Sequence, residues 1–335
     1  MSIQQKILIT GGLGYVGSHI VADIAKNYGE IIIIDNLSNS SIDVLEKLKN
    51  FTKKEISFEK VDIRNYEEIK HVFHKYLPTH VVHCAGLKSV SESAKNPLLY
   101  YDVNFTGSVN ILKAMTDIKC NNIVFSSSAT VYGEPVYLPL DERHPTNPIN
   151  PYGNTKLLVE KLIADWCELG NKSIILRYFN PVGANNNAKI GESPNGIPNN
   201  ILPYICRVAT LDLEKLNIFG DDYDTRDGTG VRDYIHVQDL ASAHGQAIQC
   251  FDKLHKSKII NLGTGVNTSV MELLNTFEKV NNLKIPYEII ERRIGDTAEC
   301  WTDCTLANSW LDWYSVKGLN DICRDAWSHT VQNKI

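Results

Sequence analysis

The chain has 335 residues, of which 43% are hydrophobic and 22% are charged, and its formal net charge is -5. This length suggests about two domains. The acidic balance leaves no basic excess to neutralise a phosphate backbone, so we expect no nucleic-acid partner. The longest aliphatic run, Ile31–Ile34, is far too short to cross a bilayer, and the N-terminus lacks the apolar region of a secretion signal. We therefore expect no membrane partner and a cytoplasmic location.

The 8 cysteines form no CxxC pair and no regular framework. In a reducing compartment this pattern indicates free thiols, and we expect no metal site. A zinc site built from Cys300, Cys304 and a distant histidine is the alternative interpretation.

Up to about residue 180, short apolar segments alternate with longer amphipathic stretches, which is typical of repeated β–α units. The expected strands are 6–10, 30–35, 56–62, 80–84, 122–126 and 173–178. The expected helices include 65–76, 98–119 and 151–169. This alternation predicts an α/β fold with a doubly wound parallel sheet of the Rossmann type.

The pattern changes at a loop rich in Gly, Asn and Pro, residues 181–200, and we place a domain boundary there. Residues 1–180 are expected to form the first domain. The segment Asp233–Val237, with the helical run that starts at Asp239, is expected to return to it, so that about 233–262 belong with 1–180. Residues 181–335 then form a smaller, discontinuous α/β domain.

The strand 6–10 leads directly into a GxxGxxG turn, formed by Gly11, Gly14 and Gly17, and then into an apolar helical pattern. Glycines here permit a tight turn and close approach of the backbone to a pyrophosphate, whose charge the helix N-terminus attracts. The second strand ends at Asp35, whose carboxylate can accept hydrogen bonds from ribose hydroxyls and repels a 2′-phosphate. The sequence therefore predicts NAD as cofactor and makes the first domain the NAD-binding one.

Two further strand ends point to the same edge of the sheet, where ligands bind in such folds. They are Asp62-Ile63, after the third strand, and Ala85-Gly86-Leu87-Lys88, after the fourth. Either segment can also be an ordinary surface turn.

Tyr152 and Lys156 begin an amphipathic helix, and their i, i+4 spacing puts the phenol and the ammonium on one face. A neighbouring cation stabilises the phenolate, so we expect a lowered Tyr152 pKa and a phenol that can act as a base. The fifth strand ends in Ser126-Ser127-Ser128, and Ser128 is our choice for the hydroxyl that bonds the reacting oxygen. A neighbouring serine can also fill this role, and a serine cluster at a strand end can be a simple cap. We expect Tyr152, Lys156 and Ser128 to be the catalytic residues.

With these motifs the chain resembles the extended short-chain dehydrogenase/reductase family and, more closely, its UDP-galactose 4-epimerase group. The similarity covers nearly the whole sequence. Its most specific segments are Thr10–His19, Ser126–Gly133, Arg177–Ala184, Gly196–Asn200 and Gly230–Val237.

The resemblance implies a reaction without net redox change. Tyr152 would take the proton of the sugar 4-hydroxyl while C4 gives its hydride to NAD, and the 4-keto sugar would turn over and be reduced on its other face. Lys156 would lower the Tyr152 pKa and bond the nicotinamide ribose, and Ser128 would orient the 4-oxygen. The cofactor would remain tightly bound throughout.

The resemblance also implies the binding residues. For the cofactor they are Gly11, Gly14, Tyr15, Val16, Gly17, Asp35, Asn36, Asp62, Ile63, Cys84, Ala85, Gly86, Leu87, Lys88, Asn104, Tyr152, Lys156 and Phe179. For the UDP-sugar they are Ser128, Tyr152, Asn180, Asn200, Ile201, Phe219, Arg232, Arg293, Asp296 and Cys300. In the second set, Phe219 would lie against the uracil and Asp296 would contact the uridine ribose. Arg232 and Arg293 are the candidates for holding the diphosphate, and an exposed structural salt bridge is the alternative for either one.

Cys300 aligns with a sugar-pocket position that is a bulky tyrosine in some epimerases and a small residue in others. The small side chain here predicts that UDP-N-acetylgalactosamine and UDP-N-acetylglucosamine are also interconverted. The other interpretation is that Cys300 is a packing residue and that its neighbours still block the space.

Three other functions share parts of this sequence pattern. A 4,6-dehydratase needs an additional acid and base beside Ser128, where this chain has Ala129 and Thr130. A uronate epimerase or decarboxylase needs a cation for the sugar carboxylate, which the sequence does not exclude. A non-catalytic NAD-binding scaffold is disfavoured by the intact Tyr152, Lys156 and Ser128.

Two expectations remain. The family pattern Asn-x-x-Gly-Thr is here Asn104-Phe105-Thr106-Gly107-Ser108, which puts the second hydroxyl contact in doubt. The resemblance and the long amphipathic stretch 98–119 indicate a homodimer, although a helix buried within its own domain has the same pattern.

Overall fold

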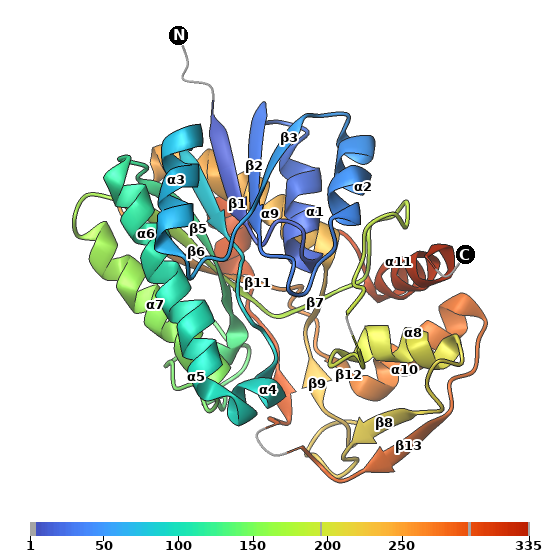
Figure 1. Ribbon diagram of the computed structural model, residues 1–335. Coiled ribbons are helices and arrows are strands. Elements are labelled where there is room, and N and C mark those ends of the chain that lie inside the picture. Colours follow the sequence, from blue (N-terminus) through green and yellow to red (C-terminus); the bar gives the residue numbers. More distant parts are fainter. Residues whose placement is uncertain (1–4, 195, 294–295, 334–335) are drawn as a thin grey trace. The chain divides into compact units, whose positions relative to one another are not determined.

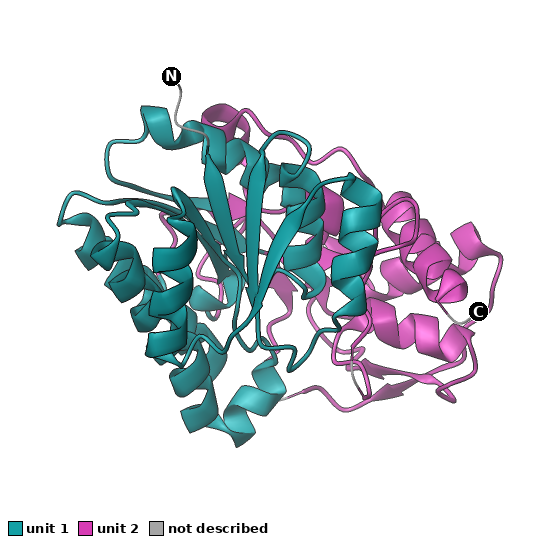
Figure 2. Cartoon of the chain, turned by 45° about the horizontal axis from the view of Figure 1, so that its top comes forward, with its two compact units in different colours: residues 1–133, 146–178, 241–260 teal, residues 134–145, 179–240, 261–335 magenta. Residues whose placement is uncertain are grey.

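The computed structural model describes residues 5–194, 196–293 and 296–333. The chain divides into two compact units, which are teal and magenta in Figure 2. Unit 1 comprises Met1–Gly133, Thr146–Tyr178 and Ala241–Ile260, and unit 2 comprises Glu134–Pro145, Phe179–Leu240 and Asn261–Ile335.

Unit 1 is built around a parallel sheet in the strand order β3-β2-β1-β4-β5-β6-β11. The five pairs from β3 to β6 are all parallel. In Figure 1, α3, α6 and α7 cover one face of this sheet, and α1 and α2 cover the other. The prediction of a doubly wound parallel sheet is confirmed.

The elements of unit 1, together with those that cross into unit 2, are β1 (Lys6–Thr10), α1 (Tyr15–Ile24), β2 (Glu30–Asp35), α2 (Asp43–Thr52), β3 (Ile56–Lys60), α3 (Tyr66–Tyr76), β4 (His80–His83), α4 (Val90–Lys95), α5 (Pro97–Tyr100), a π-helical turn η1 (Tyr101–Thr106), α6 (Gly107–Asp117), β5 (Asn122–Ser128), a 3-10 turn η2 (Ala129–Val131), α7 (Pro151–Cys167), β6 (Lys172–Tyr178), α9 (Val237–Gln249), a 3-10 turn η3 (Cys250–Lys253) and β11 (Ser257–Leu262).

The strands of unit 1 form where the sequence has unbroken runs of β-branched and other aliphatic residues. In β2 the four isoleucines Ile31–Ile34 are all buried, as expected for a parallel strand that helices cover on both faces. The core of this unit joins Leu8, Ile32 and Val81 of the sheet to Phe73 and Ile163 of the helices. The ends of β1 and β2 match the prediction, whereas β3 and β4 stop earlier, so Asp62 and Cys84 lie in the loops that follow.

Unit 2 contains helices and small sheets. Its elements are β7 (Asn180–Val182), α8 (Ile201–Ala209), β8 (Leu216–Phe219), β9 (Val231–Arg232), β10 (Tyr234–His236), β12 (Thr268–Ser269), α10 (Val270–Asn281), β13 (Tyr287–Ile290), β14 (Glu299–Cys300), a π-helical turn η4 (Ala307–Leu311) and α11 (Leu319–Gln332). The strands form the sheets β10-β7, β12-β9-β14 and β13-β8. Leu202, Ile218, Phe277 and Ile322 belong to its core.

The units and the predicted domains differ in four segments. Two of them are short, since Phe179–Asn180 and Asn261–Leu262 belong to unit 2. Residues 134–145 belong to unit 2, because the N–H of Leu140 donates to the carbonyl of Trp301 and the N–H of Asp303 donates to that of Leu140. Residues 233–240 also belong to unit 2, where β10 pairs with β7, and residues 241–260 belong to unit 1.

The expected helix 98–119 is interrupted. It consists of α5, the π-helical turn η1 and α6, and Asn104 lies buried in the π-helical turn. In the part of the chain that the structure describes, every helix is too short or too polar to span a bilayer.

Candidate functional site

The turn between β1 and α1 brings the backbone very close to neighbouring segments. Gly11 has a φ of +68°, and a Cβ atom there would lie 2.9 Å from the backbone of Ala85. A Cβ on Gly17 would lie 2.1 Å from the carbonyl oxygen of Gly11. Gly14 caps α1 without a side-chain hydrogen bond, and the first turn of α1, which holds Tyr15 and Val16, carries no acidic residue. This helix start can therefore receive an anion.

Asp35 closes the same turn from the end of β2. Its carboxylate accepts from the N–H of Leu13 at 3.1 Å, the N–H of Leu37 at 2.9 Å and the hydroxyl of Ser40 at 2.8 Å. Each carboxylate oxygen can accept about two hydrogen bonds, so Oδ2, which takes the bond from Leu13, keeps capacity for a ligand hydroxyl.

The loop after β3 holds an anchored carboxylate. Asp62 accepts from the side chain of Asn36 at 3.0 Å and forms a close ion pair with Arg64 at 2.9 Å. The Arg64 guanidinium holds the Asp62 pKa well below its usual range, so this group is an anion at neutral pH. Ile63, next in the chain, lies against Gly107 at the start of α6.

Asn104 fixes the loop after β4. Its side-chain oxygen accepts from the N–H of Leu87 at 2.7 Å, and its amide donates to the carbonyl of Leu87 at 3.1 Å and to the hydroxyl of Thr155 at 3.0 Å. Gly86 lies beside this side chain, since a Cβ atom there would be 3.0 Å from the Asn104 oxygen and 3.7 Å from the ammonium of Lys156. The predicted residues of this loop and of α7 are thus brought together.

The other predicted residues of the loop after β4 contact β1 and α1. The N–H of Cys84 donates to the carbonyl of Thr10 at 3.2 Å, and the N–H of Ala85 donates to the Thr10 hydroxyl at 3.1 Å. The ammonium of Lys88 lies 5.6 Å from the ring centroid of Tyr15.

Tyr152, Lys156 and Ser128 meet at the end of β5. Pro151 occupies the first turn of α7, and the Asn150 side chain caps the helix by accepting from the N–H of Gly153 at 2.8 Å. Tyr152 forms a side-chain hydrogen bond with Ser128. The Lys156 ammonium donates to the carbonyl of Ser126 at 2.9 Å and lies 5.9 Å from the centroid of the Tyr152 ring.

The prediction of a lowered Tyr152 pKa is wrong when only the protein chain surrounds the phenol. Burial raises the Tyr152 pKa, and the hydrogen bond with Ser128 offsets this only in part. Burial also lowers the Lys156 pKa to about 8. The physical reason is desolvation, which penalises the charged form of each group.

Ser108, which stands where the family pattern has a threonine, is buried. The Ser108 hydroxyl donates to the carbonyl of Asn104 at 2.5 Å and lies 2.8 Å from Nε2 of His83. The other ring nitrogen of His83 lies 2.7 Å from the Thr10 hydroxyl. Neither His83 nor Thr10 was named as a site residue, although both adjoin motifs that were.

Phe179 and most of the predicted substrate residues belong to unit 2. The N–H of Phe179 donates to the carbonyl of Leu262 at 3.0 Å. Four of the others form one cluster. The Arg293 guanidinium lies 4.2 Å from the ring centroid of Phe219, and Asp296 is 3.1 Å from Arg293 and 3.8 Å from Arg232.

Cys300 adjoins this cluster, because β14 pairs with β9 and places Cys300 opposite Arg232. Burial raises the pKa of its thiol to about 11, so the group is a neutral thiol at physiological pH.

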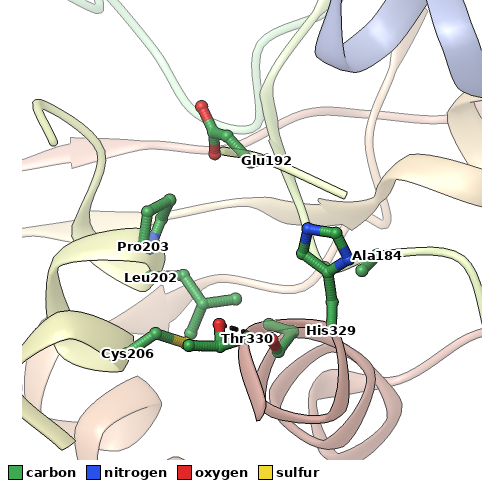
Figure 3. Close-up of a pocket in the computed structure, with 9 residues that line it drawn as sticks. Ala184, Glu192, Leu202, Pro203, Cys206, His329 and Thr330 are labelled. Atoms are coloured by element: carbon green, nitrogen blue, oxygen red, sulfur yellow. Dashed lines mark hydrogen bonds between the residues drawn. The ribbon is translucent and has the colours of Figure 1, made fainter. Parts of the chain in front are cut away.

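Asn180, Asn200 and Ile201 lie elsewhere in unit 2. Asn180, in β7, donates its amide to the carbonyl of Asp233 at 3.0 Å. Asn200 precedes α8, which Ile201 begins, and donates to Glu192 at 2.6 Å. Glu192 lines a small pocket with Leu202, Pro203, Cys206, His329 and Thr330 (Figure 3). None of the predicted substrate residues lines this pocket.

All eight cysteines are free thiols. Within residues 5–194, 196–293 and 296–333, no three His, Cys, Asp or Glu side chains are placed to hold a metal ion.

Comparison with known proteins gives a consistent result. The family model described as "NAD dependent epimerase/dehydratase family" matches residues 7–263. The chain is 45% identical to the UDP-glucose 4-epimerase of Homo sapiens, covering 98% of this chain and 97% of that protein. It is also 45% identical to the UDP-glucose 4-epimerase of Bacillus subtilis, covering 96% and 95% of the two chains.

Solved structures agree. The UDP-glucose 4-epimerase of Stenotrophomonas maltophila, with bound NAD and formylated UDP-arabinopyranose, superposes with a TM-score of 0.95 at 44% identity and covers 98% of this chain and 99% of its own. The enzyme of Bifidobacterium longum, in complex with NAD+ and UDP, also gives a TM-score of 0.95, at 40% identity and with the same coverage.

Proposed function

The chain belongs to the NAD dependent epimerase/dehydratase family, and we propose that it is an NAD-dependent isomerase that interconverts UDP-galactose and UDP-glucose at C4. The observation that carries the proposal is the cluster of Tyr152, Lys156 and Ser128 at the carboxyl end of a parallel sheet whose first turn is glycine-rich. Ligands bind at this edge of such sheets.

The residues of unit 1 fit a dinucleotide. At the β1–α1 turn, side chains are excluded at Gly11 and Gly17, and the start of α1, which has no side-chain cap, suits a pyrophosphate. Asp35 at the end of β2 has acceptor capacity for ribose hydroxyls and disfavours a 2′-phosphate. Tyr15, Val16, Asn36, Asp62, Ile63, the loop Cys84–Lys88, Asn104 and, from unit 2, Phe179 complete the proposed set.

In the proposed mechanism Tyr152 holds and moves one proton. Its phenolate takes the proton of the sugar 4-hydroxyl, and in the second half of the reaction it returns that proton to the 4-oxygen of the ketone. The Ser128 hydroxyl, already bonded to Tyr152, orients the 4-oxygen. NAD, when bound, supplies reversible hydride acceptance from C4 and a positive ring charge that favours the phenolate. The Lys156 ammonium adds a second positive charge beside the phenol.

The nucleotide half of the substrate would be held by unit 2. Arg232 and Arg293 suit a diphosphate because guanidinium groups bind phosphate oxygens in pairs. Phe219 offers a flat apolar face to the uracil, and Asp296 lies close enough to both arginines to orient them while it contacts the ribose. Asn180, Asn200 and Ile201 complete the proposed substrate set.

We further propose that acetylated UDP-sugars are substrates. Cys300 stands opposite Arg232 in the pairing of β14 with β9, and its side chain is small. A small residue there leaves room for a 2-acetamido group, which supports interconversion of UDP-N-acetylgalactosamine and UDP-N-acetylglucosamine.

Exposed leucines support a homodimer. Leu98 and Leu99 of α5 are 83% and 40% exposed, and Leu158 of the contacting helix α7 is 37% exposed. Apolar side chains grouped in this way often mark an interface. Sedimentation of the purified chain, alone and as Leu98→Glu, tests the dimer. A wild-type chain that is monomeric at micromolar concentration contradicts it.

The free cysteines support a reducing, cytoplasmic location.

The proposed function is tested by incubating the purified chain with UDP-galactose and no added cofactor. UDP-glucose should appear, because the cofactor is regenerated in every cycle and stays bound. A parallel reaction with UDP-glucuronate tests the uronate alternative. Failure to form UDP-glucose, even after NAD is added, contradicts the proposal.

A further inference from the structure

A buried ion pair lies behind the catalytic cluster and is not used by the mechanism above. Arg177 of β6 donates through Nε to Glu160 of α7 at 3.0 Å and through Nη2 at 2.6 Å. Both residues are only 3% exposed. Such a pair loses much of its attraction to the cost of removing two charges from water, so stability alone is a weak reason for its presence.

Glu160 belongs to a series of contacts that joins α7 to the end of β5. Tyr152, Lys156 and Glu160 are spaced i, i+4 and i+8, which places them along one face of the helix. Each of these residues contacts one of three consecutive serines of β5. Tyr152 bonds Ser128, Lys156 bonds the carbonyl of Ser126, and Glu160 accepts from the hydroxyl of Ser127 at 2.5 Å.

We propose that Glu160, held by Arg177 and Ser127, is a positioning residue that fixes Lys156 against β5 and keeps its ammonium charged during epimerisation. The inference rests on the proposed function for its catalytic meaning. The Glu160 side chain touches neither substrate nor cofactor in this proposal, because it lies one helical turn beyond Lys156.

The charges around Lys156 show why a fixed anion matters. His83 faces it from the end of β4 and Cys84 from the loop that follows, the Phe125 ring lies 5.0 Å away in β5, and Tyr152 and Glu160 flank it on α7. Burial lowers the His83 pKa to about 3, raises the Cys84 pKa to about 11 and raises the Tyr152 pKa, so these three groups are neutral at pH 7. Among the described groups that act on Lys156, Glu160 therefore supplies the fixed negative charge.

The test compares Glu160→Gln with the wild-type chain. The amide keeps the shape of the side chain but removes the negative charge and leaves the Arg177 cation without its partner. We expect the alkaline loss of kcat to move to lower pH by about one unit, which lowers kcat about threefold near pH 7.5 and approaches a tenfold loss well above pH 8. The exposed Asp165→Asn on the same helix is the matched control and should change nothing.

A measurement without turnover separates this inference from the proposed function. The ammonium of Lys156 can be titrated by NMR of a lysine-labelled chain, with Lys156→Met used to identify its signal. Its midpoint should fall by about one unit in Glu160→Gln and remain near the wild-type value in Glu160→Asp, which keeps the charge. An inactive wild-type chain contradicts the proposed function, while the titration still decides the role of Glu160.

A purely structural ion pair would behave differently. Glu160→Gln would then lower the melting temperature and leave both the alkaline limb of kcat and the Lys156 midpoint unchanged, and this result overturns the inference. If Glu160→Gln does not fold, Ser127→Ala decides, because it keeps both charges and removes only the anchoring hydroxyl. We expect its kcat to fall several-fold at unchanged KM; a wild-type kcat overturns the inference.

Discussion

At the scale of single residues, the structure changes the account of how Tyr152 becomes a base. The spacing of Tyr152 and Lys156 suggested that the cation acidifies the phenol, but the ammonium is bonded to the carbonyl of Ser126, and burial raises the Tyr152 pKa. The positive charge that favours the phenolate must therefore come jointly from Lys156 and from the bound cofactor. The hydroxyl remains the group on which the proposed chemistry depends.

Tyr152→Phe removes that hydroxyl and keeps the buried ring. We expect kcat to fall by at least about a thousandfold, because the loss of the proton acceptor is added to the loss of the Ser128 contact. NAD should remain bound, since the glycine-rich turn and Asp35 are untouched. The measurement is epimerase activity together with the NAD released on denaturation, and a variant with appreciable turnover would refute the assigned role.

Lys156→Met should make the protein inactive and more stable. The Lys156 pKa falls from 10.5 to about 8 on folding, so the buried charge opposes folding below pH 8 by up to about 3 kcal/mol. Between pH 8 and 10.5 the unfolded chain binds more protons than the folded one, so this cost fades as pH rises. The gain in unfolding free energy should be largest near pH 7 and absent above pH 10.5. An equal gain at these two pH values would contradict the explanation by the buried Lys156 charge.

At the scale of elements, sequence patterns predicted the strands of unit 1 well, because unbroken aliphatic runs such as Ile31–Ile34 occur where a strand is buried on both faces. The interruption of the expected helix 98–119 was not predictable. The π-helical turn there places Asn104 where it bonds Leu87 and Thr155, and neither partner is close in sequence. The two-residue strands of unit 2, such as β9 and β14, are too short to leave a periodic pattern.

The β1–α1 turn offers a comparison between two glycines. Gly17→Ala should unfold the turn, because the new Cβ would lie 2.1 Å from the carbonyl oxygen of Gly11, and we expect a loss of about 3 kcal/mol of unfolding free energy together with the bound NAD. Gly14→Ala is the control, since its φ is -70° and its nearest contact is 3.3 Å. Urea unfolding should show a change within about 1 kcal/mol for Gly14→Ala. Equal losses in the two variants would contradict the steric explanation.

At the scale of the whole molecule, the candidate site could be predicted from motifs because most of them follow a strand, and a parallel sheet brings the carboxyl ends of its strands to one edge. The place of segment 134–145 in unit 2 was not predictable, because its partners Trp301 and Asp303 lie some 160 residues away in the sequence. The contacts of Glu160 with Ser127 and Arg177 were missed for a similar reason, although its spacing of four residues from Lys156 was visible.

In the proposed function, the side chain of residue 300 determines whether the enzyme accepts acetylated UDP-sugars. Cys300→Tyr adds a ring beside Arg232, and we expect kcat/KM for UDP-N-acetylglucosamine to fall by at least about a hundredfold. The physical reason is exclusion of the 2-acetamido group by volume. UDP-galactose, which has only a hydroxyl at that position, should be turned over within a few-fold of the wild-type rate.

The matched control is Cys300→Ser, which keeps the small volume and should leave both substrates at wild-type rates. Because burial keeps the Cys300 thiol neutral, its exchange for a neutral hydroxyl changes no charge near Arg232. Coupled assays with the four UDP-sugars measure kcat/KM for the wild type, Cys300→Tyr and Cys300→Ser. If the wild-type chain turns over only the non-acetylated pair, neighbouring side chains fill the space that Cys300 leaves, and the volume of residue 300 does not set the substrate range.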